Sequence, residues 1–223
     1  MPDTKLTWFN IKEHFRKCAL IYIILIIVAL VGTDLIWTTT APRVPDEQKV
    51  LVYLADQLTH AEALNGLAAD MLEKTRAVDE TLQEVSFENL VFADPATDYT
   101  GVVVLMARLA AGEGDAFLAS QAAMDALVNS GGSQPLDEYY EAGFMKDSGL
   151  EPYYATLTNE ETGESRTFLA GFKVDTLDAL MDIQAFYNEG AYLAVALNST
   201  NLETTLKALE IMVADLEGGL PGA

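Results

Sequence analysis

The hydrophobic pattern opens with one long apolar run near the N-terminus. Residues 18–33, CALIYIILIIVALVGT, carry no charge, and LIW at 35–37 continues the run past Asp34. A helix of this length is just long enough to span a bilayer core of about 30 Å. Residues 18–37 are therefore predicted to form a single transmembrane helix.

Beyond this run, strand-like and helix-like patterns alternate. Short stretches rich in β-branched and aromatic residues are typical of buried strands, and apolar residues at i, i+3 and i+4 are typical of amphipathic helices. The stretch 97–114 fits a helix, although its valine cluster also suits a strand. Three β-α units in succession favour a parallel sheet covered by helices. The predicted strands are 49–55, 84–92 and 115–120, and the predicted helices are 56–75, 97–114 and 121–132.

Charge orients the predicted span. Residues 1–17 carry four basic and two acidic side chains, and basic flanks stay on the cytoplasmic side of a membrane. From Thr38 onward, nine Lys and Arg stand against thirty-one Asp and Glu. The N-terminus is therefore predicted to be cytoplasmic and the main domain extracytoplasmic. Because so negative a domain repels nucleic acid, we exclude nucleic acid as a partner.

Cleavage of the span depends on the residues that follow it. Small residues at 39–41 would suit a signal-peptide cleavage site, but Pro42 would follow the cut. The apolar run is also longer than the stretch of about 7–15 residues that is usual in signal peptides. We expect an uncleaved signal anchor, with cleavage as the alternative. The one cysteine, Cys18, opens the apolar run, so no disulfide is expected in the outer domain.

Candidate catalytic groups are few. The only histidines are His14, on the cytoplasmic side, and His60, so the outer domain cannot assemble a zinc site or a Ser-His-Asp triad. The carboxylates of SGGSQPLDEYYEAG (130–143) lie too close along one turn to act as a glycosidase pair across a cleft. The acidic loop ADPATD (93–98) departs from the spacing of calcium-binding loops. We therefore predict no enzymatic activity, no cofactor and no metal site.

The same acidic stretch has a structural interpretation. Pro135 cannot continue the preceding helix, and Leu136 is suited to the core. Asp137 is expected to cap a following short helix by accepting backbone N–H groups, with Glu138 and Glu141 in the first turns. The turn is therefore predicted to be scaffold.

Residues 97–143 also resemble part of a known family. They are similar to the first lobe of the extracellular solute-binding proteins of ABC importers, especially the carbohydrate type. Later segments at 162–175 and 190–217 are similar to the strand by which such proteins return to the sheet and to a later strand, turn and helix. The resemblance covers most of residues 48–217. The residues that carry it in the first lobe are Leu109, Ala110, Ala111, Gly112, Asp115, Gly132, Pro135, Leu136, Asp137 and Tyr139.

The chain departs from that family in one respect. A complete member has a second lobe of comparable size between the two later segments, whereas this chain has only residues 176–189 there, enough for one helix. The resemblance therefore implies an α/β domain truncated to a single periplasmic-binding-protein-like lobe, with an open, mostly parallel sheet and flanking helices. The expected parts are a cytoplasmic tail (1–17), a transmembrane signal anchor (18–37), a linker (38–48), an extracytoplasmic solute-binding-protein-like domain (49–217) and a flexible C-terminal tail (218–223).

Ligand-binding candidates follow from the predicted sheet. In open α/β sheets, ligands gather at the carboxyl ends of the strands, where helix N-termini present free N–H groups. Small polar residues at these ends suit a sugar hydroxyl better than an anion. The alternative is that Ser120 or Gln121 simply starts the next helix. The candidates are Asp56, Gln57, Thr59, Asp94, Ser120 and Gln121.

Two functions are compatible with these features. The first is a membrane-anchored, non-catalytic accessory or docking subunit of an ABC-type transport system, whose partner is a transporter permease or another membrane protein. The second is a low-affinity receptor that presents a carbohydrate or other small solute to an ABC importer. A hollow of about 300 Å³ or more with convergent polar groups at the strand ends would favour the receptor.

Overall fold

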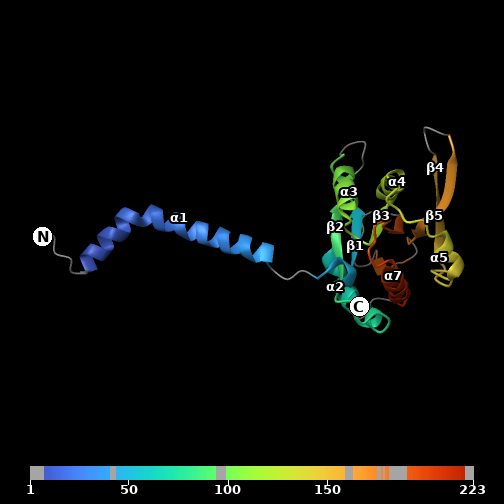
Figure 1. Cartoon of the computed structure of the whole chain (residues 1–223), viewed down its shortest axis with the longest axis horizontal. Helices are drawn as coiled ribbons and strands as arrows, with labels where there is room; N and C mark the ends of the chain where they lie inside the picture. Colours follow the sequence, from blue (N-terminus) through green and yellow to red (C-terminus); the bar gives the residue numbers. More distant parts are fainter. Residues whose placement is uncertain are drawn as a thin grey trace. The chain divides into compact units, whose positions relative to one another are not determined.

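The computed structural model (Figure 1) describes residues 8–40, 44–93, 99–158, 163–174, 177, 179–180 and 190–218. The chain divides into two compact units, Met1–Arg43 and Val44–Ala223. The first unit contains one long helix, α1 (Trp8–Thr40). Its window Arg16–Thr33 has a mean hydropathy of 2.1 and is not buried inside the protein. α1 is therefore long and apolar enough to cross a membrane.

The second unit alternates strands and helices. The helical segments are η1 (Asp46–Gln48), η2 (Ala61–Leu64), α2 (Asn65–Arg76), α3 (Thr100–Ala111), α4 (Gln121–Asn129), α5 (Asp137–Ala142) and α7 (Leu202–Glu217). The strands are β1 (Lys49–Asp56), β2 (Glu84–Val91), β3 (Ala116–Ser120), β4 (Glu151–Thr158), β5 (Ser165–Lys173) and β6 (Ala191–Val195). The predicted strands 49–55, 84–92 and 115–120 coincide with β1, β2 and β3 to within one residue at each end.

The six strands form one sheet in the order β2-β1-β3-β6-β5-β4. β1 is parallel to β2 and β3, whereas β6 is antiparallel to β3 and β5, and β4 is antiparallel to β5. β1, β2, β3 and β5 therefore run in the same direction. The predicted fold class, an α/β domain with an open, mostly parallel sheet and flanking helices, is confirmed.

The side chains of β1 alternate between two hydrophobic clusters. Val50 and Leu54 join residues of α2 and α7 on one face of the sheet. Leu51 and Tyr53 join residues of α3 and α4 on the other face. Burying each such side chain contributes about 1.5–3 kcal/mol, so a strand buried on both faces must be apolar at nearly every position. Because both clusters consist of residues from Val44–Ala223, this unit contains its own core.

The first helix of the domain begins later than predicted. The sequence predicts a helix over 56–75, but α2 begins at Asn65, and η2 precedes it. The N–H of Ala61, in η2, donates to Oδ1 of Asn89 in β2 at 2.8 Å. This bond ties the segment to a strand 28 residues further along the chain, so local periodicity could not reveal it.

The valine-rich stretch is a helix. Leu105 and Leu109 of α3 are buried, whereas Val103 and Val104 point to solvent. α3 ends at Gly112, whose φ of 69° is left-handed and is adopted readily only by glycine. The alternative that this stretch forms a strand is therefore wrong.

The turn at 130–143 belongs to the scaffold, as predicted, but one of its bonds differs from the prediction. Leu136 is buried, and its N–H donates to the carbonyl of Leu169 in β5 at 2.8 Å. Both carboxylate oxygens of Asp137 lie 3.2 Å from the N–H of Leu169, and the N-cap of α5 is Leu136. Asp137 therefore holds α5 to the sheet, and the prediction that it caps its own helix is wrong because a strand amide competes for its carboxylate.

Candidate functional sites

The carboxyl ends of β1 and β3 lie side by side, because Ala55 pairs with Ala119. Asp56 is fully buried, and its Oδ1 accepts the N–H of Gln57 at 2.7 Å. Ser120 is also buried, and its hydroxyl oxygen accepts the N–H of Ala123 at 3.5 Å as the N-cap of α4. The alternative that Ser120 or Gln121 starts the next helix is confirmed, because Ser120 is the N-cap of α4 and Gln121 is its first residue.

Gln121 belongs to a network of polar side chains at the same edge. Its Nε2 donates to Oδ1 of Asp125 at 2.7 Å, and its Oε1 accepts the hydroxyl of Tyr192. The hydroxyl of Tyr153 donates to the same Asp125 oxygen at 3.4 Å, and the Tyr153 and Tyr192 rings are 4.8 Å apart in an edge-to-face arrangement. The amide of Gln121 is thus engaged on both sides by the protein itself. We call Gln121, Asp125, Tyr153 and Tyr192 the edge network.

The other predicted binding residues are in different situations. Gln57 is exposed, whereas Thr59 is buried and its hydroxyl has no hydrogen-bond partner within the described part of the chain. Asp94 lies outside the described residues. Asp125 and Tyr192 were not predicted as site residues. They lie on α4 and β6, which are far apart in the sequence and come together only because β6 lies beside β3 in the sheet. The ligand-binding assignment therefore stays a prediction.

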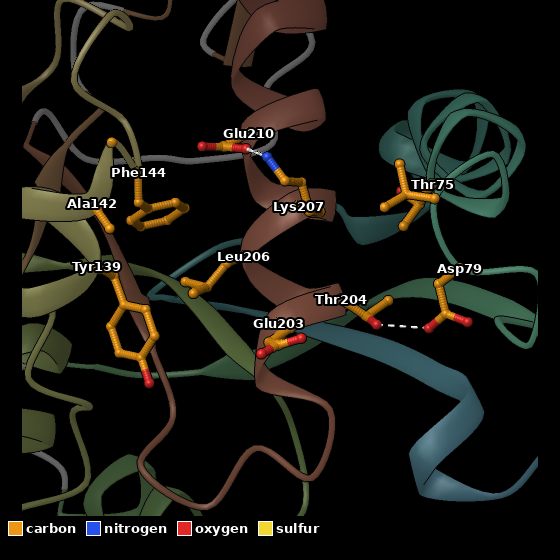
Figure 2. A pocket seen from close by; sticks show the side chains of 12 residues that line it. Thr75, Asp79, Tyr139, Ala142, Phe144, Glu203, Thr204, Leu206, Lys207 and Glu210 are labelled. Atoms are coloured by element: carbon orange, nitrogen blue, oxygen red, sulfur yellow. Dashed lines mark hydrogen bonds and ion pairs between the residues drawn. The ribbon is translucent and has the colours of Figure 1, made fainter.

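Two adjoining hollows run along α7 on the α2 and α7 face of the sheet. The larger, of about 720 Å³, is lined by α7, by α2 with the turn after it, and by α5 with the turn after it. The smaller, of about 240 Å³, continues along α7 beside the turn after α5 and shares Gly143 and Glu210 with the first. Figure 2 shows Tyr139, Ala142 and Phe144 on one side of α7, with Thr75 and Asp79 on the other. We call the two hollows together the α7 trough.

The α7 trough combines an apolar lining with carboxylates. Leu206 and Phe144 are buried at its base, and Val78 is 67% exposed at its α2 wall. Asp79 accepts the hydroxyl of Thr204 at 2.6 Å, and such donors lower the pKa of its carboxyl below the usual range. A third hollow, of about 760 Å³, lies between the end of α4 and the tips of β4 and β5. None of these three hollows is lined by Asp56, Gln57, Thr59, Ser120 or Gln121.

The described part of the chain contains no cluster of side chains that could bind a metal ion. There, no group of three or more His, Cys, Asp or Glu side chains is placed to hold a metal ion. Two of the carboxylates, those of Asp79 and Asp137, instead accept hydrogen bonds from a hydroxyl and from a backbone N–H.

Comparisons with known proteins add one structural similarity. No family model and no curated protein matches the sequence. Among solved structures, the chain is similar to AttC of Agrobacterium tumefaciens strain C58, a PBP (periplasmic binding protein) in an open, unliganded conformation. The TM-score is 0.37 at 11% sequence identity, over 75% of this chain and 79% of the AttC chain. The fold itself is defined by the sheet described above: a single α/β lobe with helices on both faces.

Proposed function

We propose that this chain is a membrane-anchored, extracytoplasmic, single-lobe protein that acts as a non-catalytic accessory or docking subunit beside an ABC-type transport system. The sequence resemblance to extracellular solute-binding proteins supports the type of system, and the apolar helix α1 supports the anchor. In this proposal residues 1–17 are cytoplasmic, 18–37 span the membrane and 49–217 form the outer domain. The partner is a permease or another membrane protein.

The edge network is the observation that carries the docking function. A solute receptor needs a few polar groups that can form hydrogen bonds with its ligand. A group that already bonds to another side chain must give up that bond before it can bind a solute. At this edge, Gln121 bonds to Asp125 and Tyr192, and Ser120 bonds to its own helix. Of the residues predicted to hold a sugar, Ser120 and Gln121 therefore already have hydrogen-bond partners within the protein.

The alternative, a low-affinity receptor for a carbohydrate or other small solute, is favoured by a different pair of groups. Gln57 is exposed, and the buried hydroxyl of Thr59 has no partner within the described part of the chain. Both follow β1 at its carboxyl end. A sugar hydroxyl that reached Thr59 would satisfy it, at the point where α/β sheets usually bind ligands.

Thermal unfolding of residues 44–223 against a panel of sugars, oligosaccharides and amino acids separates the two functions. A ligand at 100 times its dissociation constant adds about 2.7 kcal/mol to the stability of the native state. We expect no shift for any solute. A saturable shift that Gln57→Ala or Thr59→Val abolishes, and that the exposed control Gln83→Ala preserves, would replace the docking function by the receptor.

The membrane topology has its own test. In a Cys18→Ser background, single cysteines are introduced as Glu47→Cys, beyond the span, and as Lys12→Cys, before it. We expect a membrane-impermeant maleimide to label the first in intact cells and the second only after permeabilisation. Labelling of residue 12 in intact cells would reverse the orientation, and recovery of the protein from the soluble fraction would show that the anchor is cleaved.

A further inference from the structure

The side of α7 that lines the trough has a regular pattern. Glu203, Glu210 and Glu217 recur every seven residues and therefore lie in one row along the helix. Leu206 and Val213 lie between them at the spacing of the same helix face. Both are buried, at 8% and 1% exposure, so they form the floor of the trough beside the row of carboxylates.

The shape of the trough suits an elongated partner. From Glu203 to Glu217, α7 rises about 21 Å, or four turns. The two hollows adjoin at Gly143 and Glu210 and together follow α7 over this length. α2 and the turn after α5 flank it, as in grooves that receive the apolar side of an amphipathic helix.

The charge of the trough determines the charge of the partner. Its lining contains five carboxylates, and its one ammonium group, on Lys207, is already paired with Glu210 at 2.6 Å. Lysines of an incoming helix at seven-residue intervals would face the glutamate row. One apolar side chain of the trough is also uncovered, because Val78 exposes 67% of its surface.

We propose that the α7 trough is the docking site for a basic amphipathic helix of a partner protein. The apolar side of that helix packs on the exposed Val78 at the wall of the trough, and its lysines or arginines pair with the glutamate row. This inference rests on the proposed docking function and specifies its surface. It places docking on the α2 and α7 face of the sheet and leaves the edge network at the carboxyl ends uninvolved.

A synthetic helix tests the site without the natural partner. The probe is a fluorescent 21-residue peptide with leucines along one side and lysines flanking them, and the control peptide has the same composition in scrambled order. Binding is measured by fluorescence anisotropy with the full-length protein in phosphatidylcholine nanodiscs, and empty nanodiscs are subtracted. We expect the ordered peptide to bind at least about tenfold more tightly than the scrambled one, which corresponds to about 1.4 kcal/mol.

Two pairs of matched variants locate the binding. Val78→Ser removes an exposed valine of the trough, and Val91→Ser removes one that is 65% exposed on β2, outside it. The double variant E203Q/E210Q removes two charges from the glutamate row, and E62Q/E88Q removes two exposed charges elsewhere. We expect about fivefold weaker binding for each trough variant and less than about twofold for each control.

Each outcome bears on one of the two proposals. Equal weakening by E203Q/E210Q and E62Q/E88Q would mean attraction to the acidic domain as a whole and would overturn the trough as the site. So would equal binding of the ordered and scrambled peptides, or binding unchanged by Val78→Ser. None of these results alters the solute panel, whereas a saturable solute shift would refute the docking function independently of the peptide.

Discussion

Asp115 holds three strands together, and its replacement should be measurable as a loss of stability. Its Oδ2 accepts the N–H of Leu51 in β1 at 2.9 Å, and its Oδ1 accepts the hydroxyl of Ser199 at 2.8 Å. Its backbone bonds to Leu51 and to Ala196, which follows β6. The residue is 5% exposed, so water cannot readily replace these bonds.

The expected magnitude follows from the groups left behind. Asp115→Ala leaves the buried N–H of Leu51 without an acceptor, which costs about 1–3 kcal/mol. Ser199 is less affected, because Asn201 Oδ1 and Thr205 Oγ1 lie 3.4 and 3.3 Å from its hydroxyl. Asp115→Asn retains an acceptor for Leu51 and should cost less than about 1 kcal/mol.

The pH dependence has a definite sign. Burial raises the pKa of the Asp115 carboxyl above 3.8, although the bonds from Leu51 and Ser199 oppose the shift. The folded protein therefore binds this proton more tightly than the unfolded chain does, and the contribution of the carboxyl to stability falls as the pH rises through the raised pKa. Relative to Asp115→Asn, which does not titrate, the wild type should lose stability as the pH rises from 3.8.

Urea unfolding of residues 44–223 at a series of pH values between about 4 and about 7 measures both effects. The wild type, Asp115→Ala and Asp115→Asn are compared at each pH. Equal stability of the alanine and asparagine variants would refute the assignment of the Leu51 bond as the main contribution. A wild type that gains stability over Asp115→Asn as the pH rises would refute the sign of the pKa shift.

Three further predictions use the same urea assay. Gly171→Ala should lower the free energy of unfolding by about 3 kcal/mol or more, because its Cβ would lie 2.3 Å from the Leu193 carbonyl oxygen. Gly66→Ala, in open space on α2, should raise it by about 0.5–1 kcal/mol. Similar effects of the two substitutions would contradict the clash at Gly171. Met145 has a left-handed φ of 57°, so Met145→Gly should be about 1 kcal/mol more stable than Met145→Ala, and the reverse order would exclude backbone strain there. Because the pKa of Asp79 is lowered, the contribution of its carboxylate to the free energy of unfolding should be present above pH 3.8 and disappear as the pH falls through the lowered pKa. A difference in stability between the wild type and Asp79→Asn that persists in acid would contradict this prediction.

The parts of the fold that sequence predicts are those whose pattern is local and unambiguous. β1 and β3 are buried on both faces, so their apolar runs show them directly. β4 was not predicted, because it is an edge strand with mixed exposure, Pro152 near its start and Tyr154 exposed. Such a pattern satisfies neither the continuous apolar run of a buried strand nor a clear alternation.

The candidate sites depend on contacts between distant segments. The partner of Asp137 is 32 residues away in β5, and Tyr192 reaches Gln121 across 71 residues. Nothing near Gln121 in the sequence indicates this bond. The α7 trough likewise joins three separate segments, but one signal was available in the sequence: the row of glutamates at seven-residue spacing on a helix that also carries buried leucines.

The arrangement of the sheet separates the two candidate sites in space. β6 is antiparallel to β3, and Val195 at its end pairs with Ala116 at the start of β3, so α7 begins near the amino ends of the parallel strands. α2 also ends there, since the turn after it leads into β2. The edge network lies at the carboxyl ends. Gln57→Ala and Thr59→Val should therefore leave binding of the helical peptide unchanged, whereas Val78→Ser should weaken it. If Gln57→Ala or Thr59→Val weakened peptide binding as much as Val78→Ser does, the two ends of the sheet would be coupled, and docking could not be assigned to the α7 trough alone.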